Sequence, residues 1–231
     1  EIDGQGQHIA QYAIDHKVNA SLQPWRPGEQ PLPRAVDLPA VSLVFLDSEW
    51  MLQATPENYN AALLVLADEI KRIRKPYPAN LILVNAHHPM ETMGQHAGYL
   101  THFGYWLFIK VIYSLYDVDQ DIQHPDYARF INDLNTVFAQ SDRIIYAAGH
   151  EHSLQVFGSA DGKAPEYKLV SGAGNTSKVS GVWHTDNTRF ALSQEGFMEL
   201  AITANGVYLS IYDIYHNDAV AEFWLDMSAS Q

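Results

Sequence analysis

The chain has 231 residues, enough to bury one sizeable core, and its 47% hydrophobic and 18% charged residues are typical of a globular protein. Its 14 basic and 27 acidic residues give a net charge of −13, which argues against a general affinity for nucleic-acid backbones or anionic lipid. Because it lacks cysteine, it has no disulfides and no thiolate metal ligands. No run of about 18 apolar residues occurs, so no transmembrane helix is expected.

The first part of the chain predicts a strand, a helix and a second strand after an irregular start. Residues 1–40 are rich in proline and lack periodicity, which predicts an extended lead-in. The β-branched run 41–46 predicts a buried strand, and Thr55-Pro56-Glu57 is typical of a helix start. The apolar stripe of that helix consists of Leu63, Leu66, Ile70 and Ile73. Because the apolar run 80–86 follows directly, we expect two parallel strands joined by the helix.

The second half predicts one more helix and then mostly strands. Pro125-Asp126 opens the helix, whose buried face consists of Tyr127, Phe130, Ile131, Leu134, Val137 and Phe138. The run 143–148 predicts a third buried strand. Shorter strands are expected at 154–157, 166–171, 189–194, 196–204 and 206–214, with Asn205-Gly206 as the turn between the last two. The tail, 219–231, has no clear pattern.

Histidines follow two of the predicted buried strands. His87-His88-Pro89 comes after the second strand, and Gly149-His150-Glu151-His152 after the third. If the chain stays extended, His150 and His152 face one side and Glu151 the other, while Gly149 admits a close approach of backbone or ligand. Two imidazoles aimed together suit a borderline metal ion. A surface turn without a ligand explains the pair equally well.

The surroundings of these histidines resemble the calcineurin-like metallophosphoesterase family. The distal half of that family's signature has a His-His-Pro-type turn and a Gly-His-x-His turn, each after a core strand. Asp47-Ser48-Glu49-Trp50 of this chain is similar to an Asp-Ser/Thr-Gln-Trp stretch found in one bacterial branch of the family. The run 149–155 is similar to the branch's Gly-His-Glu-His-x-Leu-Gln, and Ser171-Gly172-Ala173-Gly174 to its following turn. The resemblance covers about residues 24–212.

The resemblance implies an α/β fold in which residues 41–218 form the distal half of a metallophosphoesterase β-sandwich flanked by helices, in α-β-β-α layers, followed by a tail at 219–231. It implies hydrolysis of a phosphoester substrate by two divalent or trivalent ions (Mn, Fe or Zn) that share a hydroxide. An extracytoplasmic location, periplasmic or secreted, is also expected on this basis.

The same resemblance assigns roles to individual histidines. His87 and His150 would hold one metal ion, and His152 would hold the other. His88 would be a neighbour that supports the ligands. His96 lies in a glycine-containing loop and would border the phosphate of the substrate, although an ordinary loop histidine fits that position as well.

Several motifs of the family are absent. Its upstream Asp-x-His, Gly-Asp-x-x-Asp and Gly-Asn-His motifs do not occur in residues 1–231, and no carboxylate adjoins the histidines in a matching motif. No catalytic residue is therefore assignable in this chain. We expect the bridging carboxylate and most ligands of the second ion to come from a missing N-terminal half of the domain or from a paired polypeptide.

Two other function classes fit the sequence. One is a non-catalytic relative that kept the fold as a binding or interaction module. The other is a cupin-like enzyme that uses His150-x-His152 on a β-barrel, although the two amphipathic helices and the strand-helix-strand unit speak against it.

Two geometric expectations follow from the phosphoesterase reading. The ring nitrogens of His87, His150 and His152 should lie within about 3–5 Å of one another, as ligands about 2.1 Å from shared ions require. The three strands at 41–46, 80–86 and 143–148 should be central and covered on both faces, because each is a near-continuous apolar run.

Overall fold

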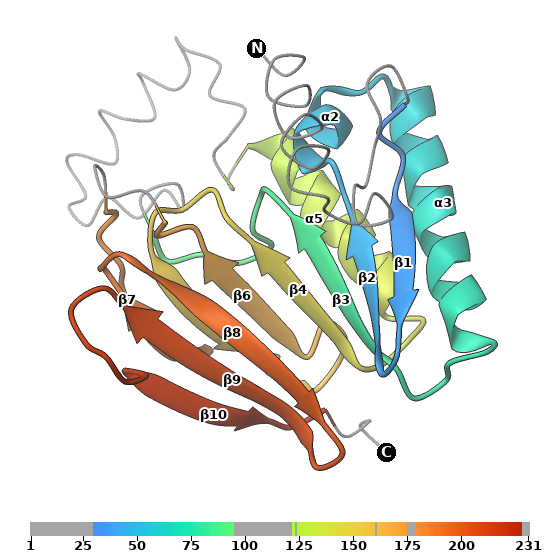
Figure 1. The fold of residues 1–231 in the computed structure, drawn as a ribbon. Helices are drawn as coiled ribbons and strands as arrows, with labels where there is room; N and C mark the ends of the chain where they lie inside the picture. The colour runs from blue at the N-terminus through green and yellow to red at the C-terminus, as the bar shows by residue number, and fades with distance from the viewer. Residues whose placement is uncertain (1–29, 95–121, 123, 160, 175–178, 228–231) are drawn as a thin grey trace, which may run out of the picture.

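The computed structural model describes residues 30–94, 122, 124–159, 161–174 and 179–227. In chain order the elements are β1 (Arg34–Leu38), β2 (Val41–Phe45), α2 (Ser48–Gln53), α3 (Pro56–Arg74), β3 (Leu81–Ala86), α5 (Pro125–Phe138), β4 (Ile144–Ala148), β5 (Leu154–Gly158), β6 (Tyr167–Ser171), β7 (Thr188–Leu192), β8 (Gly196–Thr203), β9 (Gly206–Asp213) and β10 (Ala221–Leu225). Seven strands form a mixed sheet in the order β1-β2-β3-β4-β6-β5-β7, and three form an antiparallel sheet in the order β10-β9-β8 (Figure 1).

The three predicted buried strands are confirmed as β2, β3 and β4. They pair in parallel, with strand neighbours on both edges, so none of them is an edge strand of the sheet. Successive side chains face opposite layers, as strand geometry requires. In β4, for example, Ile144 packs into the cluster beneath the helices, whereas Ile145 packs into the cluster against the small sheet. All three strands are therefore covered on both faces.

Helices α3 and α5 cover one face of the large sheet, and both begin and end near their predicted limits. The Thr55 hydroxyl accepts the N–H of Asn58 and so caps α3, with proline in its first turn. The stripes predicted for the two helices are buried or partly buried in one cluster. Between the helices, the Tyr59 hydroxyl donates to Asp133 over 2.9 Å. No helix in the described part of the chain is long and apolar enough to span a membrane.

The layers are therefore a helix layer, a seven-stranded sheet and a three-stranded sheet. The small sheet packs its inner face, which includes Val207, Leu209 and Ile211, against the large sheet. The predicted second helix layer is not found among the described residues, because the apolar side chains of α2, α3 and α5 all contribute to the cluster on the other face of the large sheet. The architecture is mixed α/β.

Both chain ends differ from the sequence prediction. The lead-in predicted as irregular contains β1, which pairs antiparallel with β2 through a turn at Ala40, whose φ is 69°. The tail contains β10, which pairs with β9. Both strands lie at sheet edges, where burial is incomplete and apolar patterning is weak. The turn between β8 and β9 is also shifted by one residue from the predicted Asn205-Gly206, because Gly206 already pairs with Thr203 in the sheet.

Candidate metal centre

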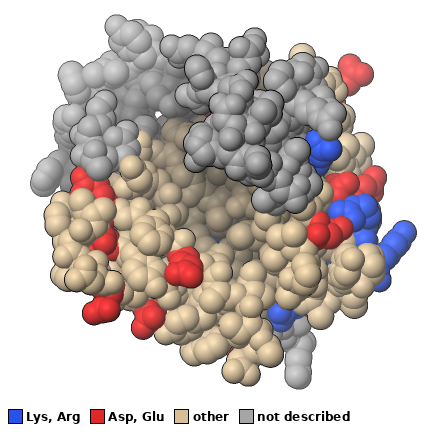
Figure 2. All heavy atoms as spheres, viewed as in Figure 1, with Lys and Arg blue, Asp and Glu red and all other residues tan. Residues whose placement is uncertain are grey.

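The centre is positioned by parallel pairing. Because β2, β3 and β4 run in the same direction, the residues that follow them meet at one edge of the sheet. On the face shown in Figure 2, the surface is hollowed at its centre, where the ends of β3 and β4 lie in Figure 1. His87 follows β3 directly, and His150 follows β4 after one glycine.

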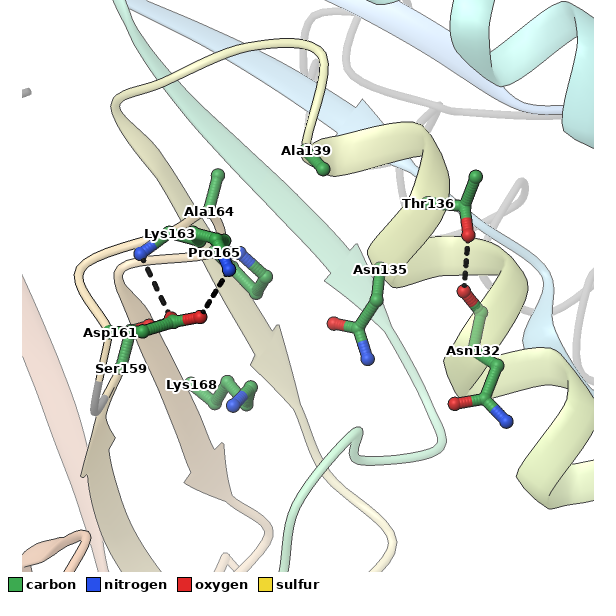
Figure 3. A pocket seen from close by; sticks show the side chains of 10 residues that line it. All are labelled: Asn132, Asn135, Thr136, Ala139, Ser159, Asp161, Lys163, Ala164, Pro165 and Lys168. Atoms are coloured by element: carbon green, nitrogen blue, oxygen red, sulfur yellow. Dashed lines mark hydrogen bonds and ion pairs between the residues drawn. The ribbon is translucent and has the colours of Figure 1, made fainter. Parts of the chain in front are cut away.

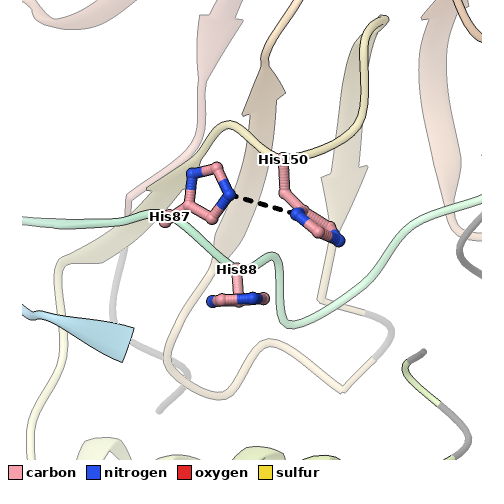
Figure 4. A group of neighbouring side chains, drawn as sticks. All are labelled: His87, His88 and His150. Carbon is pink, nitrogen blue, oxygen red and sulfur yellow. Dashed lines mark hydrogen bonds between the residues drawn. The ribbon is translucent and has the colours of Figure 1, made fainter. Parts of the chain in front are cut away.

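The histidines at this edge form a compact group (Figure 4). His150 Nδ1 and His87 Nε2 lie 3.1 Å apart, with the two rings nearly perpendicular at 81°. His88, which is fully buried, stacks at a tilt against His150 with 4.7 Å between ring centroids. One ring nitrogen from each of His87, His88 and His150 lies within 4.8 Å of the other two. The three residues are a candidate ligand set for a metal ion.

The segment that carries His150 is not extended. The N–H of Glu151 donates to the carbonyl of Gly149 over 2.7 Å, and the N–H of Ser153 donates to the carbonyl of Glu151 over 2.8 Å. These are two successive three-residue turns, and the first holds His150 at a φ of 60°. Such turns with positive φ at the centre are rare and strained, and strain of this kind clusters at functional sites. The predicted strand alternation at 150–152 is therefore wrong.

Two glycines make room for this double turn. A Cβ at Gly172 would overlap the backbone carbonyl oxygen of Glu151, and a Cβ at Gly94 would overlap the carboxyl group of Glu151. Glu151 itself is fully buried. At Gly149, in contrast, an added Cβ would meet nothing closer than His87 Nδ1 at 4.0 Å. The space beside Gly149 is therefore open, whereas Gly172 and Gly94 provide the tight contacts.

The other side of the centre is built by the start of α2. Asp47 caps this short helix by accepting the N–H of Trp50 over 2.9 Å. The next residue, Ser48, is fully buried. Its Oγ accepts the N–H groups of His87 and His88, over 3.2 and 3.0 Å, and lies 2.9 Å from His88 Nδ1. One hydroxyl thus fixes the turn that presents both histidines.

The electrostatic surroundings favour a neutral imidazole at His87. Although the residue reaches the surface, neighbouring protein atoms displace part of the water around its ring, and this desolvation lowers its pKa below the usual value of 6.5. The carboxylates of Glu49 and Asp47 oppose the shift, and His152 adds to it. Only the neutral form can bind a metal ion, so the lowered pKa preserves the ligand in mildly acidic solution.

The structure brings together only part of the predicted site. His87 and His150 meet as expected, but His152 is not a member of the three-histidine group, although it is near enough to influence the charge of His87. The turn geometry at 150–152 replaces the alternation that would have aligned the two side chains. The third member of the group is His88, which was predicted as a supporting neighbour. His96 lies outside the described residues.

Sequence reasoning missed Ser48 and Glu49 as members of the site. Glu49 Oε2 lies 3.5 Å from His88 Nε2, so a carboxylate does stand beside the histidines in space. The available signal was position, since both residues open α2, which follows β2 after Leu46 and Asp47, and β2 is the strand adjacent to β3. Residues after neighbouring parallel strands share one sheet edge.

The lowered pKa of His87 predicts a pH effect on the metal-free protein. The unfolded chain takes up a proton at His87 near pH 6.5, whereas the folded chain does so only at lower pH. The unfolded state therefore binds more protons in this window, and the free energy of unfolding falls as the pH drops from about 6.5 to the lowered pKa. When unfolding by urea is measured in the presence of a chelator between pH 7.5 and 5, the free energy of unfolding should decline less for His87→Gln than for the wild-type protein. The same change at exposed His184 serves as the control, and an equal decline in all three proteins would contradict the prediction.

A separate pocket of about 520 Å³ lies beside α5 (Figure 3). It is lined by Asn132, Asn135, Thr136, Ala139, Ser159, Asp161, Lys163, Ala164, Pro165 and Lys168. Both lysines already have carboxylate partners, Lys163 with Asp161 at 2.8 Å and Lys168 with Glu91 at 2.9 Å. The pocket therefore offers no unneutralised cation to an anionic ligand.

Comparison with known proteins supports the fold and leaves the chemistry open. No family profile and no curated protein matches the chain. A solved structure described as "GAP50 the anchor in the inner membrane complex of Plasmodium" is similar, with a TM-score of 0.55 and 14% sequence identity. The similarity covers 90% of this chain but 58% of that one, so this chain spans little more than half the length of that protein. At such low identity, the likeness concerns the fold alone.

Proposed function

We propose that this chain supplies the histidine side of a metal centre for phosphoester hydrolysis. The observation that carries the proposal is the 3.1 Å approach of His87 Nε2 and His150 Nδ1 at the ends of parallel strands. Two nitrogens bound about 2.1 Å from one ion lie about 3.0–3.4 Å apart, so the pair fits a shared ion. The resemblance of the surrounding motifs to calcineurin-like phosphoesterases supplies the reaction class.

The donor set limits what the chain does alone. A dinuclear centre needs a bridging oxygen ligand that holds two cations close against their repulsion. Asp47 already caps α2, and Glu151 is buried beneath Gly94. We therefore infer that the described part of the chain binds a single ion, and that the bridging carboxylate and the second ion's ligands come from outside these residues. Mn, Fe and Zn each accept imidazole ligands.

The role of this chain's residues in hydrolysis is to hold and orient the ion. A metal ion in such a centre polarises a phosphoryl oxygen and lowers the pKa of bound water, which generates the nucleophile. His87 and His150 leave coordination positions for water and substrate, because they supply only two nitrogens. The Ser48 contacts fix the His87 backbone, and the strained turn fixes the His150 backbone.

An assay of residues 1–231 tests this function. On an activated aryl phosphate with Mn²⁺ or Zn²⁺, the chain alone should show turnover close to that of the His150→Ala variant. Addition of a polypeptide that supplies the bridging carboxylate should raise turnover in the wild-type protein and not in His150→Ala. Robust hydrolysis by 1–231 alone that is lost in His150→Ala would show that the ligand count is wrong. No turnover in the completed protein would refute the phosphoesterase function.

A non-catalytic interaction module is the second candidate, and the small sheet favours it. Its outer face carries Phe197 stacked on Tyr212 and Tyr208 packed against Trp224, with ring centroids 5.0 and 4.8 Å apart. Phe197 and Trp224 are each 57% exposed. Exposed aromatic groups of this kind are enriched at protein interfaces. Metal binding without hydrolysis in the completed protein would favour this function.

A further inference from the structure

The outer face of the small sheet is set by the alternation of its strands. The apolar residues of β9 pack against the large sheet, so Tyr208, Ser210 and Tyr212, which alternate with them, face outward. The same alternation turns the exposed positions of β8 and β10 outward. The registers of the two strand pairs place these outward residues in rows that cross the sheet.

Two aromatic rows flank one acidic row on this face. The rings within each aromatic row are in contact, with centroids 5.0 and 4.8 Å apart, and they are Phe197 with Tyr212 and Tyr208 with Trp224. The middle row consists of Glu199, Ser210 and Glu222, in which each glutamate is the register partner of the serine. Both glutamates are exposed. Two carboxylates thus lie between two pairs of aromatic rings.

Each outer strand of this sheet carries a glutamate and an exposed ring two residues apart. Glu199 and Phe197 form this combination on β8, and Glu222 and Trp224 form it on β10. Residues two apart on a strand point to the same face and are separated by about 7 Å along the strand. Phe197 and Trp224 are each 57% exposed. A planar cation can therefore lie on the ring while it pairs with the neighbouring carboxylate.

The charge of this part of the chain has a single sign. Residues 190–231 contain several Asp and Glu residues but no Lys or Arg. On the lower left of Figure 2, where the small sheet lies in Figure 1, acidic side chains are visible and basic ones are not. The nearest polar partner of the acidic row is Ser210, whose Oγ donates to Glu222 over 3.5 Å. The sheet itself therefore offers no cation to balance the two carboxylates.

The chemistry of the acidic row indicates the class of ligand. Carboxylates only accept hydrogen bonds, whereas the guanidinium group of arginine only donates them, through five N–H groups in a planar fork. This group pairs with a carboxylate through two hydrogen bonds and also stacks on aromatic faces. A sugar, in contrast, presents hydroxyls that need donors as well as acceptors. A second copy of this chain would bring identical carboxylates together, between two chains that each have a net charge of −13.

We propose that the outer face of the small sheet binds an arginine-bearing segment of a partner protein. One guanidinium group pairs with Glu222 and stacks on Trp224, and a second pairs with Glu199 and stacks on Phe197. Because β8 and β10 lie on either side of β9, these two places are about 10 Å apart across the sheet. The inference does not depend on the proposed metal centre. It names the partner class for the second candidate function.

Fluorescence anisotropy with residues 1–231 and a labelled peptide tests the proposal. The peptide carries two arginines separated by one residue in a background of glycine and serine, because alternate residues of an extended peptide face the same way. We expect saturable binding that weakens as the salt concentration rises. Trp224→Ala, and the double variant Glu199→Gln with Glu222→Gln, should each weaken binding by about 10-fold or more. A peptide with citrulline, a neutral isostere, in place of both arginines should not bind.

Matched variants separate this face from the overall charge of the chain. Glu57→Gln with Asp68→Asn removes the same charge from exposed positions on α3, and Trp183→Ala removes a partly exposed ring outside the sheet. Both should bind the peptide as the wild-type protein does. His150→Ala should do so too, which distinguishes a failure of this inference from a failure of the metal centre.

Three results would overturn the inference. The first is wild-type binding by the double glutamine variant, and the second is equal binding of the arginine and citrulline peptides. The third is absence of peptide binding, whether the face instead holds an uncharged oligosaccharide such as cellohexaose or a second copy of this chain, each lost in Trp224→Ala. All of the substituted side chains of the sheet are exposed, so the variants should unfold at the same urea concentration as the wild-type protein.

Discussion

Gly172→Ala is expected to lower the free energy of unfolding by about 3 kcal/mol or more and to abolish metal binding. The added methyl group would overlap the carbonyl oxygen of Glu151, which belongs to the double turn that presents His150. Overpacking usually costs about 1–3 kcal/mol, and more where backbone must move. Because the obstacle is backbone and not the end of a side chain, the turn itself must shift. Urea unfolding and Zn²⁺ titration measure the two effects.

Two alanine variants of nearby glycines are matched controls. Gly174→Ala adds a methyl group that meets nothing within 4 Å, and Gly149→Ala meets only His87 Nδ1 at 4.0 Å. Neither glycine has a φ in the left-handed region, so both variants should unfold within about 1 kcal/mol of wild type. If Gly172→Ala is as stable as these controls, the close packing of Gly172 on the double turn is wrong.

Ser48→Ala is expected to cost about 3 kcal/mol or more in unfolding free energy. The Ser48 hydroxyl accepts the N–H groups of His87 and His88 and contacts Nδ1 of His88. The substitution removes all three of these interactions at a buried position. Each buried polar group left unsatisfied costs about 1–3 kcal/mol. The same variant should weaken Zn²⁺ binding, because the turn that carries His87 loses its fixed conformation. Chemical unfolding and isothermal titration calorimetry test these outcomes.

Ser42→Ala is the control for this experiment. Ser42 is equally buried, but its hydroxyl donates to Asp37, which retains its contact with Arg72. Its loss should cost about 1 kcal/mol and leave Zn²⁺ binding unchanged. Equal losses of stability in the two serine variants would contradict the special role of Ser48.

The core of the fold could be predicted because its signals are local and strong. Long apolar runs marked β2, β3 and β4, and capped amphipathic segments marked α3 and α5. The edge strands were missed because each is only partly buried, so its own apolar pattern is weak. Each is held by a hairpin partner next to it in the chain, β1 by β2 and β10 by β9.

The site was less predictable than the fold. Strand ends indicated that His87 and His150 would meet, but the expectation that His150 and His152 face the same side assumed an extended backbone. Hydrogen bonds within 149–153 and the contact with Gly172 override that preference. Likewise, the roles of Ser48 and Glu49 depend on how α2 packs over the turn after β3, which no spacing in the sequence encodes.

The parallel pairing of β3 and β4 also determines when the centre can form during folding. His87 and His150 are separated by 63 positions, and they meet only after that long loop closes and the two strands align. Non-local pairings of this kind form slowly, because the entropy of loop closure is lost before the contacts compensate for it. An ion held by the proposed centre would therefore bind after the strands have assembled, and it would stabilise the native state by slowing unfolding more than by accelerating folding.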